Sequence, residues 1–231
     1  MTNPVVSNRS KGFLKPLSLL FFLMFALSSV CGQVSDVANA FINISDEYYQ
    51  TVNREQRQLL VRDFVSGSRS GIVNQLRGRT KILDLRPEND WMRIRNSESA
   101  TLEVKLLRIN GQVRFNVLVF TACAPVCSSH VGLFDAGWNL LQVPILPEVS
   151  VEQFLDPDAV AQSGLSLSSV LARFDFPMIT YTFADDGQSL SVELQSEQLA
   201  DDESRPALAK FLATRRMTFF WDQMSGRFVK Q

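Results

Sequence analysis

Hydrophobic and polar residues alternate through the middle of the chain. In residues 91–95 and again in 102–106, hydrophobic residues recur at every second position, with Glu103 and Lys105 on the other face. This is the period of a half-buried strand. Asn110-Gly111 is typical of a tight hairpin turn. Residues 113–121 follow and include a run that is hydrophobic on both faces, which predicts a central strand covered by helices.

A helical period precedes these strands. Residues 34–66 predict a helical segment, within which Asn53 caps a helix start and Gln56 completes a capping box. Gly67 then stands where a helix ends. The sequence therefore predicts helices at the beginning of the folded part, before any strand.

The same elements recur in the second half of the chain. A hairpin is expected over residues 131–143, around Ala136-Gly137. The later expected elements are short helices over 150–155, 165–173 and 205–213, and strands over 178–184, 189–195, 217–221 and 227–229. The expected fold class is α+β: N-terminal helices followed by antiparallel β-meanders in two similar halves, with short helices between. We expect one unit over residues 33–147 and a second α+β unit, packed on the first, over 148–231.

The first 32 residues have the composition of a signal peptide. Basic residues stand at the start, and residues 17–31 form an uncharged stretch of fifteen, shorter than the roughly 20 residues that span a bilayer. Small residues end this stretch, and we expect cleavage between Gly32 and Gln33. Lipidation of Cys31 is the alternative. The protein is therefore expected to be exported to the periplasm or cell envelope, or to be an outer-membrane lipoprotein, without a transmembrane span in the mature chain.

Composition narrows the function classes. The 231 residues are 45% hydrophobic and 20% charged, with a formal net charge of −1. Such a chain can bury a sizeable core, which excludes intrinsic disorder. The near-neutral charge argues against a nucleic-acid partner, because such a protein needs a basic face.

Cys123, Cys127 and His130 form the one cluster with candidate chemistry. Zinc takes three or four ligands, and this chain contains no other histidine to complete such a site. Three residues separate the cysteines, where thioredoxin-type motifs have two. Two cysteines in an exported chain favour a structural disulfide between Cys123 and Cys127. We predict no catalytic residue, metal or cofactor, and keep a hydrolase or redox centre on Cys127 and His130 as the alternative.

Four aromatic residues near the end of the chain also bear on function. Phe219 and Trp221 share one face of a predicted strand, Phe220 lies on the other, and Phe228 belongs to the next strand. They can form a carbohydrate platform or a partner surface, but burial is the commoner fate of such residues.

Five phrases of the sequence carry a family resemblance. They are FINISDEYYQTVNREQRQLLVRDFVSG (41–67), VNQLRGRTKILDL (73–85), LEVKLL (102–107), TACAPVCSSH (121–130) and the ending GRFVK. In their order and spacing the chain resembles an uncharacterised family of exported proteins from Bacteroidales, domain-of-unknown-function family 3256. The resemblance implies an envelope location in a Gram-negative anaerobe and implies no activity. Arg77-Gly78-Arg79 departs from the two adjacent glycines of that family.

These observations together favour a non-enzymatic module. We expect an exported envelope protein that binds another envelope protein or a glycan, and no nucleic acid. The alternative from another class is the hydrolase or redox enzyme centred on Cys127 and His130.

Overall fold

The computed structural model describes Met1 and residues 34–174, 176–200 and 203–231. Residues 2–32 of the predicted signal segment, with the lipidation alternative at Cys31 and the cleavage site at Gly32 and Gln33, lie outside the described residues. In the part of the chain that is described, no helix is long and apolar enough to cross a membrane.

Two antiparallel sheets and several short helices make up the fold, so the α+β class is confirmed. The elements in chain order are α2 (Asp36–Ile42), α3 (Arg54–Val65), β1 (Ile72–Val73), β2 (Arg79–Arg86), η1 (Pro87–Asn89), β3 (Trp91–Ser97), β4 (Ala100–Ile109), β5 (Gln112–Cys123), β6 (Cys127–Asp135), η2 (Val151–Phe154), α4 (Pro157–Gln162), α5 (Leu167–Leu171), β7 (Ile179–Phe183), β8 (Ser189–Leu194), η3 (Ser196–Leu199), α6 (Ser204–Ala209), β9 (Arg216–Asp222) and β10 (Arg227–Lys230).

Each sheet is a meander in which neighbours in the sheet are neighbours in the sequence. The first has six strands in the order β1-β2-β3-β4-β5-β6, and the second has four in the order β10-β9-β8-β7. Asn110 and Gly111, with φ angles of 51° and 76°, turn β4 into β5. Positive φ at both central residues is what the Asn-Gly hairpin turn requires. The two sheets thus differ in strand number, unlike two similar halves.

The helical segment expected over residues 34–66 is two helices rather than one. Ser35 caps α2 by accepting a hydrogen bond from the Ala38 N–H, and the chain leaves the helix at Asn43. The capping box predicted at Asn53 and Gln56 is present and begins α3. Residues 43–53 form turns that connect the two helices.

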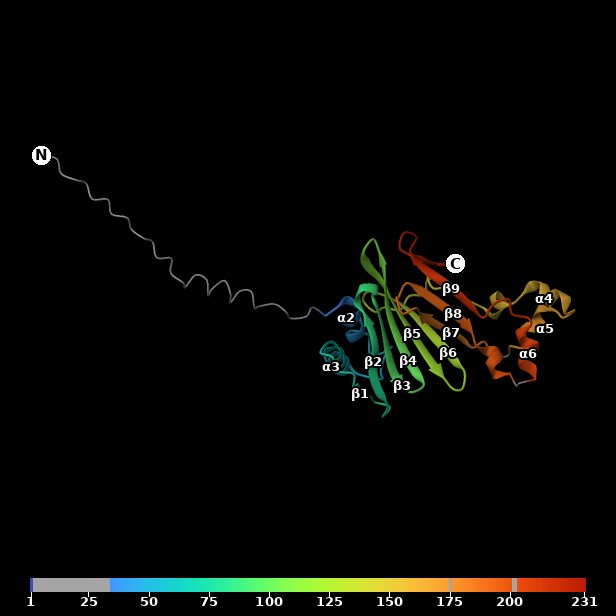
Figure 1. Cartoon of the computed structure of the whole chain (residues 1–231), viewed down its shortest axis with the longest axis horizontal. Helices are drawn as coiled ribbons and strands as arrows, with labels where there is room; N and C mark the ends of the chain where they lie inside the picture. The colour runs from blue at the N-terminus through green and yellow to red at the C-terminus, as the bar shows by residue number, and fades with distance from the viewer. Residues whose placement is uncertain (2–33, 175, 201–202) are drawn as a thin grey trace. The chain divides into compact units, whose positions relative to one another are not determined.

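Different elements cover the two faces of the first sheet. α2 and α3 pack on one face, where Ile94, Val104 and Leu118 lie in the same hydrophobic cluster as Phe41. The other face, with Val117 and its neighbours, packs against the second sheet and the segment that contains α4 to α6. In Figure 1, α2 and α3 accordingly flank the first sheet away from β7–β9. The expectation that helices cover both faces of β5 is therefore wrong for one face, which a sheet covers.

Two local predictions also need correction. Residues 131–143 fold back as predicted, but only as a short hairpin: β6 ends at Asp135, and the returning segment pairs with it through a single bridge between Phe134 and Leu140, with the Leu141 N–H bonded to the Leu133 carbonyl. The Asp135 carboxylate accepts hydrogen bonds from the N–H groups of Gly137 and Asn139, which closes the turn. β4 is not half-buried, since Glu103 on its polar side is only 3% exposed.

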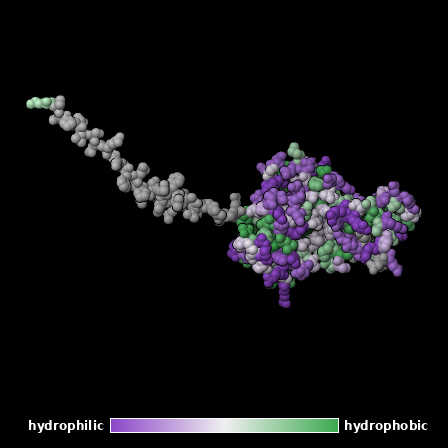
Figure 2. Space-filling view, viewed as in Figure 1, coloured by the Kyte–Doolittle hydropathy of each residue, from purple (hydrophilic) through white to green (hydrophobic). Residues whose placement is uncertain are grey.

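Residues 35–231 form one compact unit. The predicted division into two units between residues 147 and 148 stays a prediction. Figure 2 shows hydrophilic residues over most of the face of this unit that it presents, with hydrophobic residues in smaller patches.

Candidate functional site

The edge strand β7 of the second sheet forms hydrogen bonds with side chains of the first sheet, in addition to the contact between the faces of the two sheets. The backbone N–H of Phe183 donates to Glu103 Oε2 at 2.9 Å, and that of Tyr181 donates to Ser129 Oγ at 3.0 Å. The Phe183 carbonyl accepts from Arg93 Nη2 at 3.2 Å. An edge strand presents unpaired backbone groups, and here side chains of the first sheet satisfy them. This contact fixes β7 against β3, β4 and β6.

Glu103 is the centre of this junction. Its carboxylate accepts hydrogen bonds from Trp91 Nε1 at 3.1 Å, from Arg93 Nε at 3.2 Å and from the Phe183 N–H. Burial raises the pKa of the Glu103 carboxyl, while Arg93 and the hydrogen bonds act to lower it. Every oxygen of the carboxylate therefore has a protein partner. This group holds the two sheets together and does not face a ligand.

A groove of about 590 Å³ lies in the corner between the two sheets. Its lining residues are Arg93, Thr121, Cys127, Thr180, Thr182, Phe183, Ala184, Asp185, Ser191, Glu193, Gln195 and Arg216. The second sheet supplies one wall, because the side chains opposite to its buried positions face the groove. The first sheet supplies the other wall through β3, β5 and β6. We refer to this hollow as the corner groove.

The register of the second sheet arranges the groove side chains in rows. Thr182 lies opposite Ser191 on β8, and Ser191 lies opposite Thr218 on β9. Two residues along, Thr180, Glu193 and Arg216 form the next row. Directly opposite residues of an antiparallel pair share one face of the sheet. The groove wall therefore has two hydroxyl groups in one row, which Thr218 continues beyond the lining residues, beside a row with one hydroxyl and two charges.

The charged groups of the corner groove are paired with one another. Arg216 forms an ion pair with Glu193. Arg93 Nη1 lies 3.3 Å from the Asp185 carboxylate, in addition to its bond with Glu103. The lining therefore has two cationic and two anionic side chains and no net charge.

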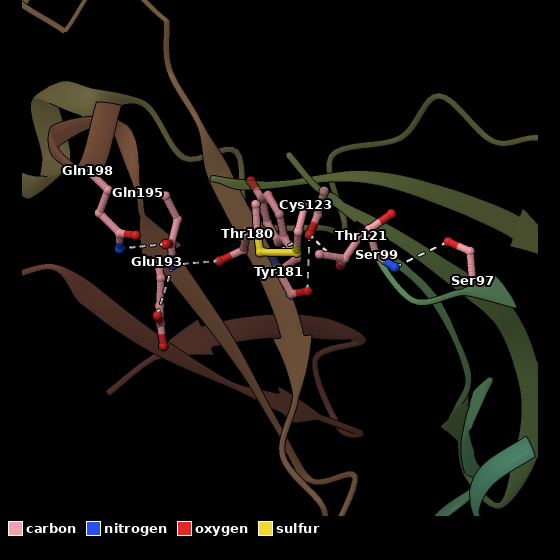
Figure 3. The surroundings of a disulfide bond; sticks show 11 residues. Ser97, Ser99, Thr121, Cys123, Thr180, Tyr181, Glu193, Gln195 and Gln198 are labelled. Carbon is pink, nitrogen blue, oxygen red and sulfur yellow. Dashed lines mark hydrogen bonds between the residues drawn. A yellow bond between two sulfur atoms is a disulfide. The ribbon is translucent and has the colours of Figure 1, made fainter. Parts of the chain in front are cut away.

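An amide chain extends the polar wall at the end of β8. Gln195 Nε2 donates to Glu193 Oε2 at 3.3 Å and lies 3.5 Å from Thr180 Oγ1. Gln198 donates in turn to Gln195 Oε1 at 2.7 Å. Figure 3 shows this series of side chains, which ends at Thr180 beside the disulfide.

The predicted cysteine pair borders the groove. The Sγ atoms of Cys123 and Cys127 lie 2.05 Å apart, the distance of a disulfide bond, and close the short loop between β5 and β6. Cys127 lines the groove together with Thr121 and Thr180, beside which Figure 3 draws the disulfide. The Cys123 N–H donates to the Ser99 carbonyl at 2.9 Å, which attaches this end of the hairpin to the turn before β4.

His130 does not join the cysteines. It lies three positions after Cys127 on β6, and successive side chains of a strand alternate between its faces. Its cross-strand partner is Phe120, on the face that α2 and α3 cover, and the His130 side chain is exposed. In the described residues, no group of three His, Cys, Asp or Glu side chains is arranged to hold a metal ion.

The aromatic residues near the C-terminus divide between the core and the surface. Phe219 is buried, and Trp221 and Phe228 are half-buried with their ring centroids 5.3 Å apart. Trp221 Nε1 donates to the Arg108 carbonyl. Phe220 is exposed and lies on the outer face, two residues along β9 from Thr218.

The sequence indicated some groove residues and missed others. Thr180 and Thr182 alternate with hydrophobic residues, so their position on the polar face of a strand follows from the pattern. The burial of Glu103 was missed. Val117 and Val119 lie on the same face of the sheet as Glu103, and their hydrophobicity was the signal that this face is covered.

Comparisons with known proteins agree on family and fold. The model of the family described as "Protein of unknown function (DUF3256)" matches residues 29–228. The solved structure of a domain of an uncharacterized protein from Porphyromonas gingivalis W83 superimposes with a TM-score of 0.68 and 21% sequence identity, covering 86% of this chain and 98% of that one. None of the curated proteins matches. At this identity the neighbour supports the fold and nothing more specific.

Proposed function

The chain belongs to the DUF3256 family of proteins of unknown function, and from this premise we propose that it is an exported, non-enzymatic binding module whose ligand occupies the corner groove. The carrying observation is the groove itself, about 590 Å³ and lined mostly by polar side chains. That volume falls in the range of small-ligand sites, which is about 300–1,000 Å³.

The chemistry of the lining supports binding rather than catalysis. A nucleophile needs an adjacent base. The Cys127 sulfur is bonded to Cys123, and the His130 side chain lies on the opposite face of β6. The carboxylate of Glu103 is engaged by three donors. The hydrolase or redox alternative on Cys127 and His130 therefore has no observation in its favour.

Export is the second part of the proposal. The basic start and the fifteen-residue uncharged stretch of the signal segment support secretion to the periplasm or envelope. Mass spectrometry of the native protein should find an N-terminus at Gln33 without a lipid. A diacylated Cys31 would identify the protein as an outer-membrane lipoprotein instead. An intact Met1 would contradict export.

A ligand screen with a blocked groove tests the binding role. The purified protein is heated with a panel of uncharged oligosaccharides, peptides and small polar metabolites, and its melting temperature is recorded. A ligand that binds only the folded state raises the melting temperature. Thr182→Arg, which fills the groove, should remove that rise. The control Gln58→Arg, at an exposed position of α3, should keep it.

Two results would contradict the proposal. One is an equal rise in the blocked variant and the control, which places the ligand elsewhere. The other is turnover of a panel compound that is lost on Thr182→Arg, because the groove would then be catalytic.

A further inference from the structure

We propose that the ligand of the corner groove is a neutral oligosaccharide, bound by the hydroxyl rows of β7–β9 with one sugar ring stacked on Phe220; this inference rests on the proposed binding function. The outer face of the second sheet combines hydroxyl groups, amides and one exposed aromatic ring, and each of these features restricts the ligand.

The paired charges indicate a ligand without net charge. Glu193 is neutralised by Arg216, and Arg93 by Glu103 and Asp185. An anionic ligand would have to compete with these carboxylates for the guanidinium groups. A cationic one would have to compete with the guanidinium groups for the carboxylates. Neither has an unpaired partner of opposite charge among the groove residues that the structure describes.

The free hydrogen-bonding groups favour a ligand rich in hydroxyls. Thr182, Ser191 and Thr218 form one row of hydroxyls, whereas the Thr121 hydroxyl on the opposite wall is already hydrogen-bonded to Ser129 Oγ at 2.8 Å. A hydroxyl donates one hydrogen bond and accepts two, so a row of hydroxyls is matched by groups that also donate and accept. The several free hydroxyls of each unit of a neutral oligosaccharide have this property. An extended peptide presents donors and acceptors that are fixed by its backbone, and it cannot add to the β7 edge beside the groove, because Glu103 and Ser129 already bond to backbone N–H groups there.

Phe220 is not one of the residues that line the corner groove, but it lies on the same face of the second sheet and supplies an apolar surface beside the hydroxyl row. It is 39% exposed on the same face as the hydroxyl rows, two residues from Thr218 and opposite Ser189. Val229 lies directly across from it on β10 and is 45% exposed. The face of an aromatic ring is electron-rich and attracts the polarised C–H groups of a sugar ring. The spacing of two strand residues, about 6.6 Å, separates the ring from the hydroxyl row, and one sugar unit has a comparable length.

The test compares three probes on the purified protein by calorimetry and by saturation-transfer NMR. The probes are neutral oligosaccharides of two to four units, the same set with uronic-acid sugars, and uncharged peptides of four to six residues. Neutral oligosaccharides should bind, and their uronic-acid counterparts should bind more weakly. The NMR experiment should show transfer from aromatic protons to the C–H protons of one sugar.

Two variants test the location of the site: one replaces an exposed ring, and the other replaces a threonine with the isosteric valine, so both should keep the fold. Phe220→Ala should weaken oligosaccharide binding roughly two- to tenfold through lost stacking. Thr182→Val, which keeps the shape and removes the hydroxyl, should weaken it by a similar two- to tenfold factor. The matched controls are Leu76→Ala, an exposed apolar side chain before β2, and Thr51→Val, between the two helices; both should bind as the wild type does.

The outcomes separate this inference from the proposed function. Peptides that bind with sensitivity to Thr182→Val, while sugars do not bind, would overturn the sugar inference and keep the groove as a binding site. Tighter binding of the uronic-acid set would overturn the neutral ligand. If sugars bind both Phe220→Ala and Thr182→Val as tightly as the wild type, two claims fail: that the sugar binds these residues, and that the corner groove is the binding site.

Discussion

The two faces of the first sheet differ in how they are covered. Toward α2 and α3 the face is mostly hydrophobic: Met92, Ile94 and Leu102 have no exposed surface, and the buried Asn96 accepts a hydrogen bond from the Tyr49 hydroxyl. Toward the second sheet, Trp91 and Val119 are equally buried, but Glu103 lies among them. A helix satisfies its own backbone groups along its length, so its partner surface does not have to supply acceptors for a row of backbone N–H groups. A strand edge brings unpaired N–H groups, so its partner surface needs acceptors.

The comparison explains which residue types the two faces require. The acceptors are Glu103 and Ser129, and Arg93 is the donor to the β7 carbonyl. Buried polar groups of this kind stabilise only when every partner is present. We therefore expect the helix-covered face to respond to lost volume and the sheet-covered face to respond to lost hydrogen bonds and to pH.

The largest effect is expected on the helix-covered face. Phe41 of α2 is fully buried, with its ring centroid 6.0 Å from that of Tyr49. Phe41→Ala should lower the free energy of unfolding by about 3–5 kcal/mol, because it removes a buried ring and leaves a cavity. Urea unfolding measures this loss. The control Val65→Ala, 65% exposed on α3, should change it by about 0.5 kcal/mol or less.

This first prediction fails if Phe41→Ala loses less than about 1 kcal/mol, a value typical of a poorly buried position. Phe120 is a weaker probe of the same face, because its ring is only half-buried beside the same cluster.

The next effect distinguishes the sheet-covered face by pH. Burial lowers the pKa of Lys105 from 10.5 to about 8, although Asp90 acts to raise it. Its Nζ donates to the Asn89 carbonyl at 2.5 Å. Between these two pKa values the unfolded lysine keeps a proton that the folded lysine has released, so stability rises with pH in this window.

Lys105→Met removes this dependence. Between pH 7 and pH 10.5 the free energy of unfolding of the wild type should rise relative to the variant by about 2–4 kcal/mol. Urea titrations at several pH values measure the difference. If the free energies of unfolding of the wild type and Lys105→Met change with pH in the same way, the lowered pKa of Lys105 is contradicted. Phe41→Ala is the control: it removes no charge, so its free energy of unfolding should change with pH as that of the wild type does.

A smaller effect is expected from Glu103→Gln. The substitution keeps the size of the side chain and one acceptor oxygen, but it ends the charge-assisted bond with Arg93 and turns an N–H group toward other donors. The free energy of unfolding should fall by about 1–3 kcal/mol. The matched control Glu98→Gln, whose side chain is 94% exposed beside Arg95, should be nearly neutral. A Glu103→Gln variant as stable as the wild type would mean that β7 does not need this carboxylate.

The smallest effect belongs to the disulfide, which lies outside both buried faces. Cys123→Ser with Cys127→Ser should lower stability by about 1–2 kcal/mol, because a loop of this length restricts the unfolded chain only slightly. Thermal unfolding should show a modestly lower midpoint. Thiol labelling of the wild type under denaturing, non-reducing conditions checks the bond, and full labelling of both cysteines would contradict it.

Local patterns predicted the elements that depend on local physics. The Asn53 capping box and the Asn110-Gly111 turn are each complete within four residues, and both are found. The hairpin predicted after β6 is found only as a short one, closed by the Asp135 carboxylate on Gly137 and Asn139 and paired through one bridge between Phe134 and Leu140.

The corner groove could not be predicted in the same way. The polar period of β4 indicates one solvated face, and only a sheet that begins far along the chain, at Ile179, covers that face. Thr180 and Thr182 were identified as polar positions of a strand, but their meeting with Thr121 depends on the docking of β7. The site is a product of long-range packing, which a period of two residues does not encode.

The order of the strands has a consequence for how the chain folds. In both meanders each strand pairs with its neighbour in sequence, so the sheets can form from local contacts, and such topologies fold quickly. Docking of β7 onto Glu103 and Ser129 is the distant step. Until it occurs, β7 is an open edge that another unfinished chain can extend by adding a strand. A chain with Glu103 replaced should therefore aggregate during refolding at concentrations at which the wild type recovers, and light scattering can follow this directly.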